Sequence, residues 1–265
     1  MWDHRASAFS SLRNGSGGCS FLWVLCQPNS ARAHYNLGSA IIAGSSDGRE
    51  RRALSSFLRT LSIDPTYDEA WNNAAATYEG LGQHDRAATA YEALSALRGY
   101  DDSYAVNAVG RALAAQGKGA EAAVKFEGAI ALGEEQGQCQ AHALFNLAKL
   151  RGEGGGALEL YTAAAACDPS YRGAREAAGA ALHGARRSGE AVQHFEAALE
   201  LLGDGADRTR ALSNLGGVLA AAGRGAEAVA LLEGALQEAE RNGAATEDLQ
   251  RNLEAAKRRL SRSNK

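Results

Sequence analysis

The chain has 265 residues, 45% of them hydrophobic, so it is long enough to bury a sizeable core and is not disordered as a whole. Its 28 Lys and Arg residues nearly balance its 31 Asp and Glu residues, and the formal net charge is −3. This balance provides no global field for a nucleic-acid backbone or an anionic membrane. We therefore expect no nucleic-acid partner, and protein or peptide partners are favoured.

The first part of the chain has its own composition. Residues 1–18 are rich in Ser, Gly and Arg and carry one acid, Asp3, which predicts a disordered tail, with a targeting peptide as the alternative. The most apolar run, Phe21 to Cys26, is much shorter than the roughly 20 residues needed to cross a bilayer. We therefore expect no membrane span in this chain and a cytoplasmic location.

The four cysteines are Cys19, Cys26, Cys139 and Cys167. They lie far apart in the sequence and form none of the C-x-x-C pairs that zinc or dithiol chemistry prefers. The pattern predicts free thiols that are buried or incidental.

The three prolines, Pro28, Pro65 and Pro169, are separated by 37 and 104 residues, close to one and three times a period near 35. Such spacing indicates an array of repeats. Between the prolines, Ala-, Leu- and Glu-rich segments of about a dozen residues alternate with glycine-containing turns, without the alternating Val, Ile and Thr of strands. The sequence predicts an all-α protein.

The segment 70–94 shows one unit of the array. Its first half predicts a helix with one packing face at i, i+3, i+4 and i+7, made by Trp71, Ala74, Ala75 and Tyr78. After a turn at residues 80–82, a second helix has a stripe of Ala87, Tyr91 and Leu94. Two short helices that each need one face covered are expected to cover each other as a hairpin.

This stretch resembles the tetratricopeptide repeat family, whose pattern is W-x2-L-G-x2-Y, then A-x3-F, an apolar residue and P. The signature can be traced six times, in residues 31–67, 68–102, 103–140, 141–171, 172–208 and 209–240. The resemblance implies an α-solenoid in which helix-turn-helix repeats form a right-handed superhelix.

The flanks of the array extend the same reading. Pro28 occupies the slot that Pro65 and Pro169 fill later, so residues 19–30 are expected to be a partial leading repeat. Residues 241–261 predict an amphipathic capping helix with Leu249 and Leu253 on its inner side. Residues 262–265 are expected to form a basic tail.

An asparagine recurs at one position of the repeat pattern, directly before the Leu or Ala that precedes the small residue (the G of W-x2-L-G-x2-Y). These asparagines are Asn36, Asn73, Asn146 and Asn214. The resemblance implies that the first helix of each repeat lines a concave groove. A primary amide there can pair with the N–H and C=O of an extended peptide. The alternative is that these asparagines cap or link neighbouring helices. The same register predicts further peptide-binding residues: Tyr35, Asn72, Tyr104, Asn107, His142, Phe145 and Arg210.

We find no constellation of residues that predicts catalysis. The six histidines show no metal-ligand spacing, and no Ser, Cys or His arrangement indicates a nucleophile. A G-x-G-x-x-A match at residues 152–157 follows no strand and falls in a turn between helices. We expect no enzyme activity, no cofactor and no metal, and a scaffold or adaptor whose groove binds an extended peptide.

Two narrower resemblances give alternative functions. The run LCQPNSARAHYNLGSAI, residues 25–41, resembles the junction in transmembrane-and-tetratricopeptide O-mannosyltransferases of the endoplasmic reticulum. It implies the lumenal repeat portion of such an enzyme, with the catalytic membrane half absent from this sequence. The asparagine series also resembles the repeat arm of O-GlcNAc transferases.

Overall fold

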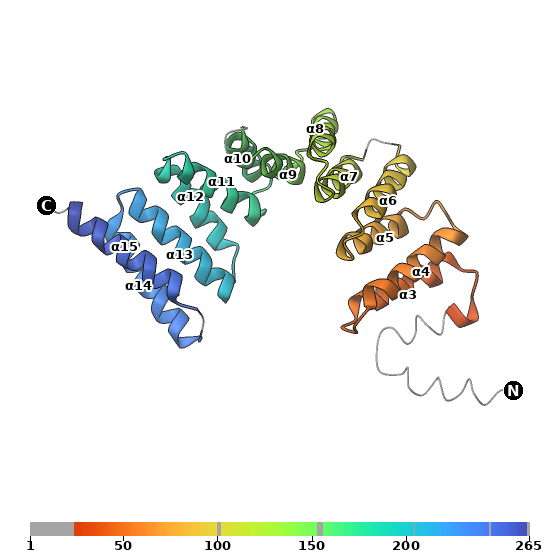
Figure 1. Cartoon of the computed structure of the whole chain (residues 1–265), viewed down its shortest axis with the longest axis horizontal. Helices are drawn as coiled ribbons and strands as arrows, with labels where there is room; N and C mark the ends of the chain where they lie inside the picture. Colours follow the sequence, from red (N-terminus) through yellow and green to blue (C-terminus); the bar gives the residue numbers. More distant parts are fainter. Residues whose placement is uncertain (1–23, 100–101, 153–155, 204, 244, 264–265) are drawn as a thin grey trace. The chain divides into compact units, whose positions relative to one another are not determined.

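The computed structural model describes residues 24–99, 102–152, 156–203, 205–243 and 245–263. Within these ranges every regular element is an α-helix, so the predicted all-α class is confirmed (Figure 1). The chain divides between Gly137 and Gln138 into two compact units. The two units are described separately, as unit 1 and unit 2.

Unit 1 contains three helical hairpins in which each helix packs against the next along the chain. Their helices are α3 (Ala31–Ala43), α4 (Arg49–Ile63), α5 (Asp68–Gly80), α6 (His84–Leu97), α7 (Ser103–Ala115) and α8 (Gly119–Glu135). Residues 24–26, before α3, are also helical, whereas the predicted tail at 1–18 and the start of the leading repeat lie outside the described residues.

Unit 2 contains three further hairpins and one closing helix. The hairpins are formed by α9 (Ala141–Arg151), α10 (Ala157–Cys167), α11 (Arg172–Gly184), α12 (Ser188–Glu200), α13 (Ala206–Ala221) and α14 (Gly225–Arg241). The closing helix, α15 (Glu247–Ser263), packs against both α13 and α14. It covers their apolar faces with Leu249, Leu253 and Ala256, all of which are buried.

Small residues let the two helices of a hairpin approach closely. A Cβ atom added at Gly110 of α7 would lie 2.7 Å from Cε1 of Phe126 on α8. Gly179 and Phe195 make the same fit between α11 and α12, where the added Cβ would lie 2.8 Å from the ring. The glycine of the repeat signature therefore provides the space that the aromatic ring of the second helix fills.

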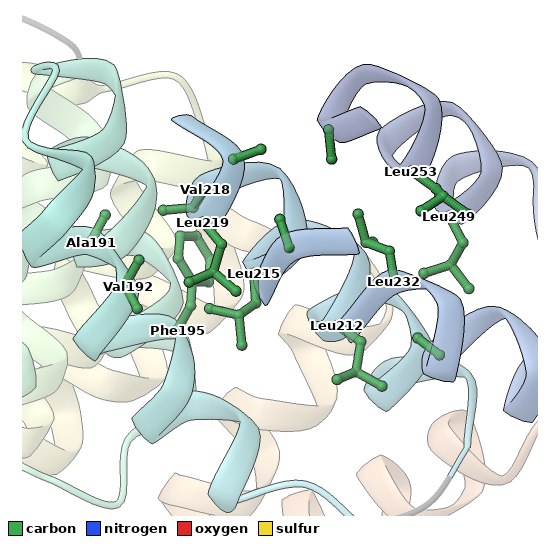
Figure 2. Packing of buried hydrophobic residues seen from close by; sticks show 14 of the residues in the cluster. Ala191, Val192, Phe195, Leu212, Leu215, Val218, Leu219, Leu232, Leu249 and Leu253 are labelled. Carbon is green, nitrogen blue, oxygen red and sulfur yellow. The ribbon is translucent and has the colours of Figure 1, made fainter. Parts of the chain in front are cut away.

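The core of unit 2 is built from leucines, valines and alanines of α11 to α15 (Figure 2). Phe195, Leu215 and Leu219 lie together beside Val192, and Leu232 lies between α13 and the closing helix. Because each hairpin buries its face only against its neighbours, the core runs from one hairpin to the next, as in repeat proteins.

Candidate functional site

The first helices of the hairpins carry all of the predicted site residues. We call these first helices the A-helices: α3, α5 and α7 in unit 1, and α9, α11 and α13 in unit 2. The closing helix α15 is counted with them, although it belongs to no hairpin. Three A-helices begin in the same way. Trp71 Nε1 donates a hydrogen bond to the carbonyl oxygen of Pro65 (2.9 Å), and Arg175 Nε donates to that of Pro169 (2.7 Å).

His34 completes this series, since its Nε2 lies 3.0 Å from the carbonyl oxygen of Pro28. The first position of the repeat pattern, the W of W-x2-L-G-x2-Y, is therefore filled in these three repeats by different side chains. Each carries an N–H group six residues after a proline. The hydrogen bond fixes the turn between one hairpin and the next, because it satisfies a carbonyl that follows the end of the preceding helix.

The asparagines connect successive A-helices. Asn73 Nδ2 of α5 donates to Tyr35 Oη of α3 at 3.2 Å. In unit 2, Asn252 Nδ2 of α15 donates at 3.0 Å to both the carbonyl oxygen and Oγ of Ser213 on α13. In both cases the acceptor residue directly precedes the asparagine position of the previous repeat, Asn36 or Asn214. The two units thus use the same bond at the same register.

Each of these amides keeps unused capacity. A primary amide has two N–H donors and one carbonyl acceptor, and the bonds to the neighbouring A-helix use the nitrogen of each amide and not its carbonyl oxygen. The linking role that the sequence left open is therefore present for Asn73, and it does not exhaust the hydrogen-bonding capacity of that side chain.

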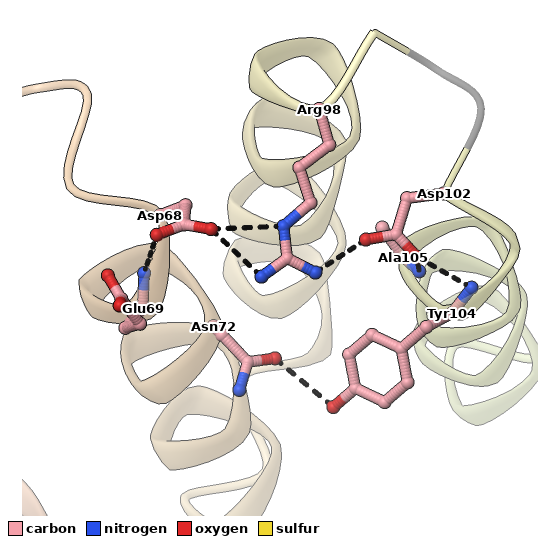
Figure 3. A network of polar contacts seen from close by, with 7 residues as sticks. All are labelled: Asp68, Glu69, Asn72, Arg98, Asp102, Tyr104 and Ala105. Carbon is pink, nitrogen blue, oxygen red and sulfur yellow. Dashed lines mark hydrogen bonds and ion pairs between the residues drawn. The ribbon is translucent and has the colours of Figure 1, made fainter.

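A second set of polar contacts joins α5 to α7 (Figure 3). Tyr104 Oη donates to Asn72 Oδ1 at 3.1 Å. Arg98, which follows α6, donates to Asp68 Oδ2 (2.9 Å) and also pairs with Asp102, the residue that caps α7. Hydrogen bonding with Glu69, and in smaller part with Arg98, lowers the pKa of Asp68.

Among the clefts of the described residues, one in each unit is lined by an asparagine of this register. The unit-1 cleft has a volume of about 350 Å³ and is lined by Asn73 together with Ser39 and Ala76. The unit-2 cleft has a volume of about 580 Å³ and is lined by Asn214 and Asn252. Each cleft therefore contains at least one amide of the asparagine register.

Small residues line both clefts three positions after the asparagine register along each helix. In unit 2 they are Ala180, Gly217 and Ala255, on α11, α13 and α15. Gly217 and Ala255 each lie three residues after the asparagine of their helix, as Ser39 and Ala76 do in unit 1. Side chains of this size leave room for a ligand backbone to come close to the helices.

The unit-2 cleft carries charges of both signs on its walls. Glu176 of α11 is held by Arg172 at 2.9 Å, and Arg259 of α15 lies elsewhere in the lining. His183 also lines the cleft and has its Nδ1 2.9 Å from Ser188 Oγ. Since neither sign dominates, hydrogen bonding and shape are the main means of recognition available there.

Aromatic side chains cluster at the start of unit 2. His142 of α9 is exposed and stacks on Tyr171, with ring centroids 4.5 Å apart. Phe145 packs at 5.2 Å against Tyr171 and at 5.5 Å against Tyr161. We call these four residues the aromatic group. The predicted residues His142 and Phe145 therefore lie in one cluster, because Tyr171 is placed beside α9 by the turn that follows α10.

The other predicted residues differ in their surroundings. Asn107 is buried, with 7% of its surface exposed, so its amide offers little surface to a ligand. Asn36 and Asn146 are half-buried, whereas Tyr104 is 48% exposed. Arg210 is exposed and pairs with Asp207 at 2.9 Å. The structure thus gathers Asn73 and Asn214 into clefts and leaves Asn107 inside the packing of α7.

The expectation of four free thiols was wrong for two of them. Cys139 and Cys167 form a disulfide, with Cα atoms 5.7 Å apart, whereas Cys26 is free and exposed. The reason is the hairpin itself: residues before its first helix and at the end of its second helix are neighbours in space. Cys19 lies outside the described residues.

Groups of metal-ligating side chains and membrane-spanning helices are both absent from the described part of the chain. No group of three or more His, Cys, Asp or Glu side chains there is arranged to hold a metal ion. In the same residues, no helix combines the length and the apolar composition that a membrane span requires.

Sequence reasoning missed Asn252 as a member of the asparagine register. It lies 38 residues after Asn214, close to the repeat period, and this spacing is the signal that identifies it. The register extends into the closing helix, so α15 acts on the cleft side as a further A-helix.

Stacked helical hairpins with a recurrent glycine-aromatic fit define a helical-hairpin repeat protein. Residues 56–89 match the family model of the tetratricopeptide repeat. No curated protein sequence matches the chain.

Among solved structures, the chain is similar to PilW, a widely conserved type IV pilus biogenesis factor, with a TM-score of 0.62 and 21% identity over 84% of this chain and 98% of that one. It is similar to Pseudomonas aeruginosa PilF with a TM-score of 0.62 and 18% identity, over 83% of this chain and 95% of the other. It is also similar to the structure of the APC/C hetero-tetramer Cut9–Hcn1, with a TM-score of 0.62 and 16% identity over 96% of this chain and 48% of that one. The chain thus carries a tetratricopeptide repeat and has the all-α fold of such repeat proteins.

Proposed function

We propose that this chain is a protein-interaction scaffold that binds extended peptide segments in the clefts of its A-helices. The observation that carries the proposal is that a cleft occurs in each unit at the asparagine register, with small residues three positions further along the helix. The same combination in two separate units favours a role for the register in ligand binding rather than a local accident of packing.

The chemistry of the clefts favours peptide backbone as the ligand. The amides of Asn73, Asn214 and Asn252 can pair with both N–H and C=O groups, which every peptide presents regardless of its side chains. Ser39 Oγ, in the lining of the unit-1 cleft, is buried without a hydrogen-bond partner among the described residues. A buried hydroxyl in this state is stabilised when a ligand supplies the missing partner.

The strength of binding follows from the number of such bonds. Each hydrogen bond contributes roughly 1 kcal/mol net. Several bonds, together with apolar contacts to side chains such as Phe195 in the unit-2 cleft, fit an affinity in the micromolar range, which corresponds to about −8 kcal/mol. The scaffold is therefore expected to exchange its ligands rather than to hold one permanently.

The test begins with peptides selected from a random display library on the full chain. Each peptide has about 12 residues, which span roughly 40 Å at the ~3.3 Å rise per residue of an extended backbone. Their affinity is then measured by fluorescence anisotropy for the wild type and for Asn214→Ala. We expect at least ten-fold weaker binding, since Asn214 is exposed in the cleft and its loss leaves the helix packing intact.

Asn242→Ala is the matched control, because Asn242 follows α14 and is an exposed asparagine outside the A-helices. Its affinity is expected to equal that of the wild type. Selected peptides that bind Asn214→Ala and Asn73→Ala as tightly as the wild type, with helicity unchanged by circular dichroism, would refute the proposal.

A second candidate function is the lumenal repeat portion of an O-mannosyltransferase. The Cys139–Cys167 disulfide favours it over the arm of a nucleocytoplasmic O-GlcNAc transferase, since disulfides persist in oxidising compartments such as the endoplasmic reticulum. Tagging the protein at its own genomic locus, so that any sequence outside these 265 residues is kept, in a cell with an organelle-targeted biotin ligase distinguishes the two. Labelling in the lumen supports the second candidate, and labelling only in the cytosol excludes it.

A further inference from the structure

The disulfide lies at the open end of the fourth hairpin, formed by α9 and α10. Cys139 is two residues before α9 begins at Ala141, and Cys167 is the last residue of α10. The end of α9 at Arg151 and the start of α10 at Ala157 lie at the other end of the hairpin. The disulfide thus joins the two ends of the hairpin that the chain does not connect directly.

This hairpin also has the smallest apolar core. Its helices have 11 residues each, against 13 to 17 for the other helices from α3 to α15. Besides Leu147, the buried residues of α9 and α10 are alanines: Ala141, Ala143, Ala148, Ala157, Ala164 and Ala165. Small side chains remove less apolar area from water, so packing stabilises this pair less than the others.

The aromatic slot of the second helix shows the same weakness. In five hairpins this slot holds a buried side chain, at Phe57, Tyr91, Phe126, Phe195 and Leu232. In the fourth hairpin it holds Tyr161, which is only half-buried. A cross-link offsets such a deficit, because closing a loop of this size reduces the entropy of the unfolded chain.

We propose that the Cys139–Cys167 disulfide is a redox-labile clasp on which the packing of the fourth hairpin depends, so that a dithiol reductant loosens α9 and α10 selectively. The chain is accordingly suited to an oxidising compartment. The clasp also controls the aromatic group, since Cys139 is three residues before His142 and Cys167 is four residues before Tyr171. A contribution of the aromatic group to peptide binding rests on the proposed function, whereas the clasp itself does not.

The reaction is an ordinary two-electron exchange. A thiolate of the dithiol attacks one sulfur, the bond between Cys139 and Cys167 breaks, and a mixed disulfide forms. The second thiol of the reductant then displaces the protein sulfur. Cys139 and Cys167 each end as a thiol with one proton gained, and the reductant is oxidised to its disulfide.

The first experiment tests whether the clasp forms. The full chain is exported to an oxidising compartment, alkylated without reduction and digested with trypsin. Cleavage after Lys125, Lys149, Arg151 and Arg172 separates the two cysteines, so the disulfide is detected as residues 126–149 linked to residues 152–172. Cys26 is expected in alkylated form. Absence of the linked pair would overturn the proposal.

The second experiment measures amide hydrogen exchange of the full chain, without any ligand, before and after complete reduction by dithiothreitol. We expect exchange at least ten-fold faster throughout α9 and α10 and a change of less than two-fold in α5 and α6. The variant Cys139→Ser/Cys167→Ser should show the fast pattern without reductant, and Cys26→Ser should match the wild type.

Equal exchange in α9 and α10 before and after reduction would contradict the proposal, and so would uniform acceleration of every helix. Neither result depends on a bound peptide. A failed peptide-binding test therefore leaves the clasp standing, and a failed exchange test leaves the peptide proposal standing.

Discussion

The hairpins α7/α8 and α9/α10 show two ways of holding the same repeat together. In α7/α8, Gly110 admits the ring of Phe126, which is 1% exposed, and Val109 and Leu113 are buried beside it. In α9/α10, Ala148 replaces the glycine, Tyr161 is half-buried, and a disulfide joins the ends. One hairpin relies on close packing and the other on a smaller core with a cross-link.

The comparison teaches that the repeat register specifies the arrangement of the helices but not the source of stability. Both hairpins have a small residue and an aromatic residue at the same positions of the repeat, Gly110 and Phe126 or Ala148 and Tyr161, so both adopt the same topology. Their stabilities are expected to respond to different perturbations: α7/α8 to the size of its buried side chains, and α9/α10 to the redox state of its cysteines.

The largest expected effect is that of Phe126→Ala. Truncating a fully buried Phe typically costs 3–5 kcal/mol, so we expect the free energy of unfolding of unit 1 to fall by about 4 kcal/mol. Tyr161→Ala in unit 2 should cost only about 1–2 kcal/mol, since less of its surface is removed from water. Trp71 fluorescence in a urea titration reports on unit 1, and equal costs for the two variants would break the comparison.

Gly110→Ala tests the close fit directly. The added Cβ would lie 2.7 Å from Phe126, and overpacking of this kind costs about 1–3 kcal/mol. Ala148→Gly, the opposite change in α9/α10, is expected to cost about 1 kcal/mol, mainly through helix propensity. A stabilising effect of Gly110→Ala in the urea midpoint would show that the glycine is not needed for the ring.

A substitution in one of the turns between paired helices is expected to increase stability. Gly117, between α7 and α8, has φ +78°, and Arg186 has φ 63° in the turn between α11 and α12. A side chain in this left-handed region costs about 1 kcal/mol, so Arg186→Gly should raise the stability of unit 2 by about that amount. Gly117→Ala is the converse control and should lower the stability of unit 1. Thermal unfolding followed by circular dichroism measures both.

The smallest expected effect concerns pH. Asp168 follows Cys167, and its pKa is lowered mainly by a hydrogen bond from the Ser170 hydroxyl, with the Ser170 backbone N–H adding to it. A lowered carboxyl pKa contributes stability that is complete above the ordinary value of 3.8 and is lost as the pH falls through the folded value.

Asp168→Asn removes this titration. The melting temperature of the variant is therefore expected to decrease less than that of the wild type between pH 5 and pH 3. Identical decreases would mean that the turn after α10 does not depend on the ionised carboxylate. Asp64, which makes the same contacts with Thr66 after α4, provides the equivalent measurement in unit 1.

The sequence predicted the all-α class because helical periodicity and a repeat period are local signals. It did not predict why Arg175 stands where another repeat has Trp71. The family pattern describes that slot by size, whereas both side chains share an N–H group that reaches a proline carbonyl.

The asparagines show a different limit of sequence reasoning. Their register was visible, but whether an amide links two helices or faces a ligand depends on which side chain precedes the asparagine in the previous repeat. At Tyr35 and Ser213 that side chain carries a hydroxyl within reach. The disulfide was missed because its cysteines were judged by separation along the chain, and an antiparallel hairpin brings such residues together.

The most direct test of the account is to follow the side-chain amide signals of asparagine by NMR while a selected peptide is added to the full chain. We expect the Nδ2 signals of Asn73, Asn214 or Asn252 to shift with peptide concentration, whereas that of Asn242 should not. Shifts confined to Asn242 and to residues of the second helices, with those three signals unmoved, would contradict it.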